Sequence, residues 1–134
     1  MTSAAGASQP TVTTKISPLP FADTVSRFTR ILDAKDVKVF AIIDQRAEAR
    51  SAGLDLRDTT LVIFGNPAAG TPVMAAAPLA ALDLPLKVLI WADGDQVKVS
   101  YVPPAEVGSR YQLSDDLTTR LAAIDALTDA LVAP

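Results

Sequence analysis

The residues best suited to bind a ligand lie in segment 64–74, FGNPAAGTPVM, where a proline twice stands two residues after a glycine. In the second of these turns Thr71 could cap a helix that starts at Pro72, because threonine accepts backbone N–H groups and proline tolerates the first helical position. A helix start presents unpaired N–H groups, so Gly70 and Thr71 could hold a phosphate or a carboxylate. The pattern also serves as a purely structural turn, because its spacing matches no phosphate-binding loop. Both interpretations stay open.

Two further polar residues could contribute to such a site. Asn66 stands between a glycine and a proline, where its amide could face a ligand or satisfy backbone groups inside a tight turn. Asp44 ends a predicted strand and begins a predicted helix, and capping that helix would account for it fully. The sequence therefore predicts a site for a small anionic ligand, with four candidate binding residues: Asp44, Asn66, Gly70 and Thr71.

Two missing residue types restrict the chemistry. The chain contains no histidine and no cysteine, which excludes a Ser–His–Asp triad, thiolate chemistry and the common zinc sites. We expect no metal and no cofactor. An alternative to a binding domain is an enzyme acting on a small anionic metabolite, which would depend on positioning and hydrogen bonds. Asp44 would be its polar group, Asn66 and the helix start at Thr71 would hold the anion, and Tyr101 would be the acid.

Charge and hydropathy argue against two classes of partner. The chain has 12 basic and 15 acidic residues and a net charge of −3, without a basic cluster, so no nucleic acid partner is expected. No apolar stretch approaches the length of a membrane span, and residues 1–15 lack the basic start and apolar run of a secretory signal. We therefore expect no membrane partner and, by default, a cytoplasmic location.

The elements that must position these residues follow from the spacing of apolar side chains. Residues 1–10 predict a flexible arm, and residues 11–134 have the length of one domain. Alternating or two-sided apolar runs predict strands, and spacings of three and four predict helices. The resulting order is β-α-β-α-β-α-β-β-α. A hairpin after three strand–helix units predicts an α+β fold, with a mostly antiparallel sheet of about four to five strands and helices on one face.

Three segments predict local structure in more detail. Strand 37–44 carries apolar residues on both sides, which predicts cover on both faces. Segment 103–113 is expected to be a loop or short turn, and one last helix should follow the cap residue Ser114. Asp93-Gly94 predicts a two-residue hairpin turn that pairs Ile90 with Val97.

The hairpin also places an aromatic side chain on the less apolar face of the sheet. Counting outward from the turn puts Leu89, Trp91 and Lys98 on the face opposite the predicted core. Tryptophan on an open sheet face is typical of interfaces. We therefore predict a homodimer that uses Leu89, Trp91 and Lys98, while a ligand groove or cover from the chain itself stays open as an alternative.

Four segments in sequence, FAIID, LDLRDTTLVIFGNPAAGTPVM, AALDLPLKVLIWAD and VKVSY, resemble the bacterial family called domain of unknown function 302. The resemblance covers residues 12 to 130. It implies a compact α+β domain with a curved sheet, often dimeric, and no established activity. Family members usually carry a histidine after the Ile-Asp pair that is Ile43-Asp44 here, whereas this chain has Gln45. A metal or acid–base role that depends on that histidine cannot be transferred, which favours binding over catalysis.

Overall fold

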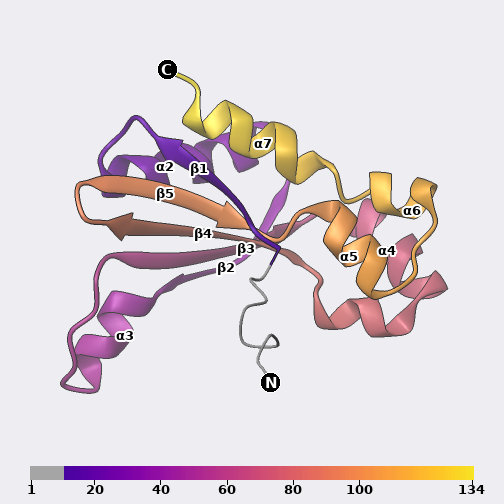
Figure 1. The fold of residues 1–134 in the computed structure, drawn as a ribbon, viewed down its shortest axis with the longest axis horizontal. Coiled ribbons are helices and arrows are strands. Elements are labelled where there is room, and N and C mark those ends of the chain that lie inside the picture. The colour runs from indigo at the N-terminus through magenta and orange to yellow at the C-terminus, as the bar shows by residue number, and fades with distance from the viewer. Residues whose placement is uncertain (1–10) are drawn as a thin grey trace, which may run out of the picture.

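A computed structural model describes residues 11–134; the arm predicted at residues 1–10 lies outside them. The described chain forms one sheet and a set of helices (Figure 1). The strands are β1 (Thr13–Ser17), β2 (Lys38–Asp44), β3 (Thr59–Gly65), β4 (Leu86–Asp93) and β5 (Gln96–Tyr101). The helices are α2 (Phe21–Ala34), α3 (Gln45–Ser51), α4 (Pro67–Ala76), the 3₁₀ helix η1 (Pro78–Leu82), α5 (Pro104–Arg110), α6 (Asp115–Thr119) and α7 (Ala123–Val132).

The sheet has five strands in the order β1-β5-β4-β3-β2, and every neighbouring pair is antiparallel. This confirms the predicted α+β fold, with an element order close to the prediction. In Figure 1, α3 projects from one end of the sheet, whereas α4, α5 and α6 gather at the other end. The two ends of the strands therefore carry different structures.

The main core lies between one face of the sheet and the helices α2 and α7. Phe28 of α2 packs edge-on against Phe64 of β3, with ring centroids 5.4 Å apart and planes at 87°, a favourable aromatic arrangement. The buried members of this core are Phe28, Leu32, Val62, Phe64, Val88, Ile90, Val99, Tyr101, Ile124, Leu127 and Leu131. The face of β4 and β5 predicted to meet the helices is confirmed.

A second, smaller core lies under α4, η1, α5 and α6. Its buried residues are Val73, Ala80, Val107 and Leu121. Two local predictions were wrong in this region. Segment 103–113 contains α5, and the last helix is interrupted, so Ser114 caps α6 while α7 begins at Ala123. The break lets Leu121 reach the small core while Ile124 and Leu127 reach the main one.

The hairpin between β4 and β5 differs from the prediction by two residues. Ile90 pairs with Val99, and Asp93 pairs with Gln96, so the turn residues are Gly94 and Asp95. Gly94 has a φ of +61°, a conformation that glycine adopts at little cost. Because side chains alternate with a period of two, a shift of two residues leaves every side chain on its predicted face.

Strand β2 also differs from the prediction. It forms an edge of the sheet, and a bulge between Val39 and Ala41 shifts its register against β3. An edge strand at the border of the helical layer cannot be covered on both faces. Phe40 and Ile42 accordingly remain 45% and 49% exposed, so the predicted two-sided cover was wrong.

Candidate functional site

The helix after segment 64–66 begins earlier than expected. Asn66 is the cap of α4: its side-chain Oδ1 accepts the N–H of Ala68 at 2.9 Å, and Pro67 takes the first helical position. The predicted cap at Thr71 was wrong, because Asn66-Pro67 satisfies the same rule one turn earlier. The N–H groups of Ala69 and Gly70 both reach the carbonyl of Asn66 at 2.9 Å. The start of α4 therefore has no spare N–H group in its first turn for an anion.

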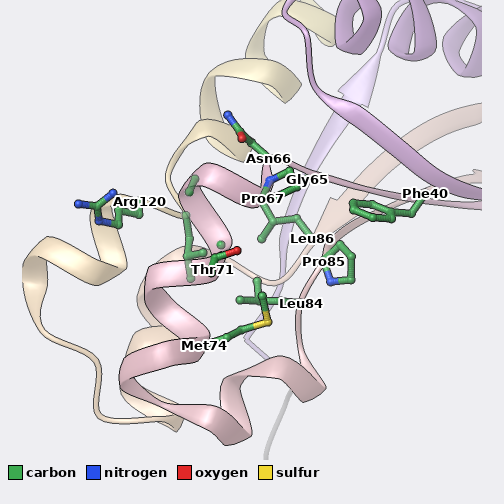
Figure 2. A pocket seen from close by; sticks show the side chains of 13 residues that line it. Phe40, Gly65, Asn66, Pro67, Thr71, Met74, Leu84, Pro85, Leu86 and Arg120 are labelled. Carbon is green, nitrogen blue, oxygen red and sulfur yellow. The ribbon is translucent and has the colours of Figure 1, made fainter.

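A cavity of about 300 Å³ nevertheless lies beside this segment (Figure 2). Asn66, Gly70 and Thr71, three of the four predicted site residues, line it. The rest of the lining is mostly apolar and includes Phe40, Pro67, Met74, Leu84, Pro85 and Leu86. Strand β2, helix α4 and the start of β4 thus each contribute one part of the wall, a mainly apolar lining typical of small-molecule sites.

The polar groups of the cavity are few. Among the described residues that line the cavity, one is charged: Arg120, which lies between α6 and α7. Its Nε lies 4.0 Å from Asp116, whose side chain is 86% exposed, so this ion pair is weak. Sequence reasoning missed Arg120, because no local pattern links it to a turn so much earlier in the chain.

A hydrogen-bonded cluster fixes the wall formed by Leu84, Pro85 and Leu86. The carboxylate of Asp83 accepts hydrogen bonds from the hydroxyl of Tyr111 and, at 2.8 Å, from Arg110 Nη1. Burial alone would raise the pKa of Asp83, but these two donors bring it below its ordinary value. The hydrogen bond to Asp83 in turn raises the pKa of Tyr111. The end of η1 is thereby tied to α5.

The structure does not bring Asp44, the fourth predicted residue, to the cavity. Asp44 pairs with Thr60, whereas the cavity residue Gly65 pairs with Lys38 at the other end of β2. Thr60 and Gly65 stand five positions apart on β3, which corresponds to about 17 Å of strand. Asp44 caps α3 instead, accepting the N–H of Ala47 at 2.9 Å, so its structural role is confirmed.

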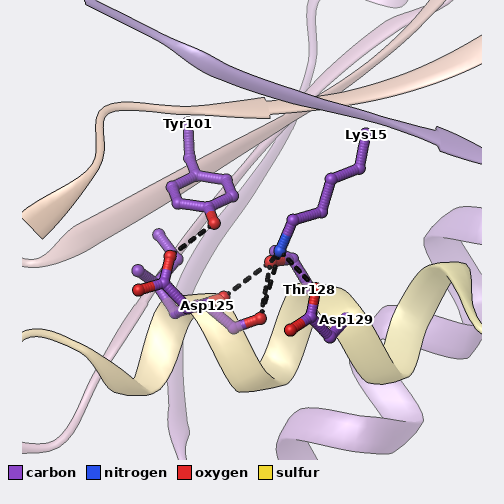
Figure 3. Close-up of polar contacts among 6 residues, drawn as sticks. Lys15, Tyr101, Asp125, Thr128 and Asp129 are labelled. Atoms are coloured by element: carbon purple, nitrogen blue, oxygen red, sulfur yellow. Dashed lines mark hydrogen bonds and ion pairs between the residues drawn. The ribbon is translucent and has the colours of Figure 1, made fainter.

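Tyr101, the acid of the alternative enzyme, also lies elsewhere. It is 4% exposed and belongs to the main core. Its hydroxyl donates to Asp125 Oδ1 at 2.6 Å (Figure 3). Lys15 lies beside it, with Nζ 5.2 Å from the ring centroid and 2.7 Å from Thr128 Oγ1. These contacts join β1 and β5 to α7, which is a structural function.

The residues predicted for the dimer interface do share the open face of the sheet. Trp91 pairs with Lys98, and Leu89 pairs with Ser100, so all four point to the side opposite the main core. One row of this face crosses every strand and consists of Thr14, Ser100, Leu89, Leu61 and Ile43. We call this side of the sheet the open face. It is more apolar than the solvated side of an antiparallel sheet usually is.

Polar atoms on the open face form hydrogen bonds and ion pairs with neighbouring side chains. The indole N–H of Trp91 donates to Ser100 Oγ at 2.9 Å. Lys98 Nζ lies 2.6 Å from Asp93 and 5.4 Å from the centroid of the Trp91 ring. The Lys98 ammonium lowers the pKa of Asp93. The one polar atom of Trp91 therefore has a hydrogen-bond partner, and the Lys98 ammonium near its ring is paired with Asp93.

Residues 11–134 hold no group of three or more metal-ligating side chains. Each helix formed by this part of the chain is too short or too polar to cross a membrane.

Comparison with known proteins gives one family. The family described as "Domain of unknown function DUF302" matches residues 12–131. The crystal structure of the uncharacterized conserved protein DUF302 from Bacillus stearothermophilus is similar, with a TM-score of 0.77, 17% identity, and coverage of 91% of this chain and 95% of that one. At that identity the similarity concerns the fold alone.

Curated relatives are much longer proteins. A protein named fluoride-specific ion channel FluC 1, from Brucella suis biovar 1, is 38% identical over 93 residues, which make up 69% of this chain and 37% of the relative. A protein of the same name from Brucella abortus biovar 1 shows the same identity over 34% of its length. This chain therefore spans about a third of the relatives that it matches.

Proposed function

The chain belongs to the DUF302 family, and we propose that this member is a homodimeric binding domain that holds a small anionic ligand in the cavity beside α4. The observation that carries the proposal is the cavity itself. Asn66, Gly70 and Thr71 line it, its wall is mainly apolar, and its one charged lining residue among those described is the cation Arg120. A concave apolar pocket with a few polar groups is the usual form of a ligand site.

The arrangement favours binding over catalysis. The enzyme alternative needs Asp44, Thr71 and Tyr101 around one substrate, but Asp44 lies at the far end of β2 and Tyr101 belongs to the main core. Among the described residues, those lining the cavity include no carboxylate, tyrosine or lysine that could transfer a proton.

Thermal unfolding with a panel of small carboxylates, phosphates and sulfates tests the ligand site. A ligand at a hundred times its dissociation constant should stabilise the fold by about 2.7 kcal/mol. Gly70→Leu, which fills the cavity, should abolish that shift. Ala68→Leu is the matched control, because Ala68 is an exposed residue of the same helix. A panel without any shift, or shifts that Gly70→Leu leaves intact, would contradict the proposal.

The partner proposed for the open face is a second copy of this chain. A sheet of five strands about 24 Å wide and about 20 Å long offers about 500 Å² per protomer, so two copies would bury about 1,000 Å². That value reaches the lower bound of specific interfaces. Trp91 and Leu89 would lie near the centre, and because Lys98 is paired with Asp93, two like faces can meet without strong repulsion.

Light scattering after size-exclusion chromatography measures the association directly. We expect a dimer for the unchanged chain and a monomer for both Trp91→Glu and Ile16→Glu. Ile16 is 54% exposed and pairs with Lys98 on the open face, so its replacement leaves the core intact. Leu79→Glu, at a 70% exposed position on η1, should remain dimeric. A monomeric unchanged chain would rule out this part of the proposal.

The names of the Brucella relatives raise fluoride as a second candidate ligand. The cavity does not favour it, because a strongly hydrated small ion gains nothing from the apolar wall and would lose its water. Fluoride and chloride at equal ionic strength should therefore give the same unfolding temperature. A stabilisation specific to fluoride would overturn the assignment of the cavity to larger anions.

A further inference from the structure

We propose that the ligand of the cavity is a monocarboxylic acid with a short apolar chain, whose carboxylate binds Arg120 and whose chain lies against Met74, Leu84 and Leu86. This inference rests on the proposed function and specifies the chemistry of that site. Three features of the cavity support it: the distribution of polar groups, the single positive charge, and the size.

The polar and apolar parts of the lining lie apart. In Figure 2, Arg120 is at one side of the group of side chains, with its guanidinium directed outward, and Phe40 is at the other side, with Thr71 and Pro67 between them. Pro85 and Leu86 lie on the side of Phe40, and Leu84 lies beside Met74. A ligand that fills such a cavity has one polar end and one apolar end. Sugars and nucleotides do not fit, because their hydroxyl groups would be buried against apolar atoms without hydrogen bonds.

The charge of the site fits a single carboxylate. Arg120 contacts Asp116 only at 4.0 Å and through Nε, which leaves its terminal nitrogens available for the bidentate pairing that guanidinium forms with carboxylate. One cation balances one negative charge. A dicarboxylate or a doubly charged phosphate would bring a second charge to a wall that offers no partner for it.

One neutral donor can complete the recognition of the carboxylate. Thr71 lines the cavity together with Arg120, and in Figure 2 its hydroxyl points toward the other lining side chains. This hydroxyl makes no hydrogen bond to another of the described residues, so it can donate to a ligand.

The size sets the length of the chain. A cavity of about 300 Å³ lies at the lower end of the range for ligand sites. It therefore suits a short carboxylic acid better than a long fatty acid. Hexanoate is a suitable probe, since it has one charge and one unbranched apolar chain.

Isothermal titration calorimetry with four probes tests the proposal: hexanoate, hexanamide, succinate and inorganic phosphate. Hexanoate should bind. Hexanamide keeps the chain and lacks the charge, so it should bind at least about tenfold more weakly, since a charged hydrogen bond contributes about 1.5–3 kcal/mol. Succinate and phosphate should not bind. Arg120→Gln should reduce the affinity for hexanoate to that for hexanamide, and Arg30→Gln, at an exposed position of α2, should not change it.

The results separate this inference from the proposed function. Equal binding of hexanoate and hexanamide, or binding of hexanoate that Arg120→Gln leaves unchanged, overturns the carboxylate assignment. If hexanoate fails while another anion binds and Gly70→Leu abolishes that binding, the ligand class is wrong and the binding function stands. If no anion binds, both are wrong.

Discussion

Replacing Gly70 with alanine should make the folded chain more stable, which makes Gly70→Ala an informative change. Gly70 lies within α4 and lacks a left-handed backbone, and an added Cβ would meet only Met74 Cε, at 3.9 Å. Nothing in the fold therefore requires glycine there. Alanine is more stable than glycine inside a helix by about 0.5–1 kcal/mol. We expect the free energy of unfolding to rise by that amount, and the unfolding temperature by about 2–4 °C.

Two other glycines provide controls with the opposite sign. Gly53 has a φ of +76° and open space around it, so Gly53→Ala should cost about 1 kcal/mol through the backbone alone. In Gly108→Ala the new Cβ would overlap the Thr118 hydroxyl and lie 3.0 Å from its Cγ2. That change should cost about 1–3 kcal/mol, and Thr118→Ala should restore part of the loss.

Urea unfolding followed by circular dichroism, at one protein concentration, measures all of these values. The reasoning is refuted if Gly70→Ala destabilises the chain by more than about 0.5 kcal/mol while the two controls behave as expected. The same methyl group also enters the cavity, so the variant should bind hexanoate more weakly. Stability and binding would then change in opposite directions, as expected where a ligand site has kept space at the expense of stability.

Three further predictions concern contacts around the site and the core. Asn66→Ala removes the cap of α4 and should cost about 1 kcal/mol in urea unfolding, whereas Asn66→Asp should retain most of it. Burial alone would raise the pKa of Asp83, but the hydrogen bond from Tyr111 helps to bring it below the ordinary value. This hydrogen bond should therefore stabilise the folded chain fully at a pH above the ordinary carboxyl pKa of about 4. The stabilisation should be lost as the pH falls through the lower pKa of the folded state. A parallel pH dependence of the unfolding free energy in the unchanged chain and Asp83→Asn would contradict this. Tyr101→Phe removes the 2.6 Å bond to Asp125 and should cost about 1 kcal/mol; an unchanged urea midpoint would show that water replaces that bond fully.

The faces of the strands could be predicted because they depend on a short period in the chain. The register of β4 and β5 was wrong by two residues, yet Trp91, Leu89 and Lys98 lie on the predicted face, because side chains alternate with a period of two. Asp44 as a cap was predicted from its neighbours, and the bond to Ala47 spans three residues. Interactions between residues so close in the chain can be predicted from the local sequence.

The start of α4 shows where local rules become ambiguous. Asn66-Pro67 and Thr71-Pro72 both satisfy the pattern of a cap residue followed by proline. The chain adopts the earlier one because β3 ends at Gly65, and α4 then begins directly after that strand, at Pro67. Where a strand ends depends on its pairing with neighbouring strands, and no local pattern specifies that pairing.

The sequence by itself determined the family, the α+β class and the two faces of the hairpin, and it singled out segment 64–74, several of whose residues line the cavity. The tertiary structure alone decided that Arg120 joins Asn66 and Thr71 at one cavity, and that Asp44 lies at the opposite end of the sheet. The physical reason is range. Caps and alternation depend on residues a few positions apart, whereas the cavity depends on antiparallel pairing and helix packing that bring distant parts of the chain together.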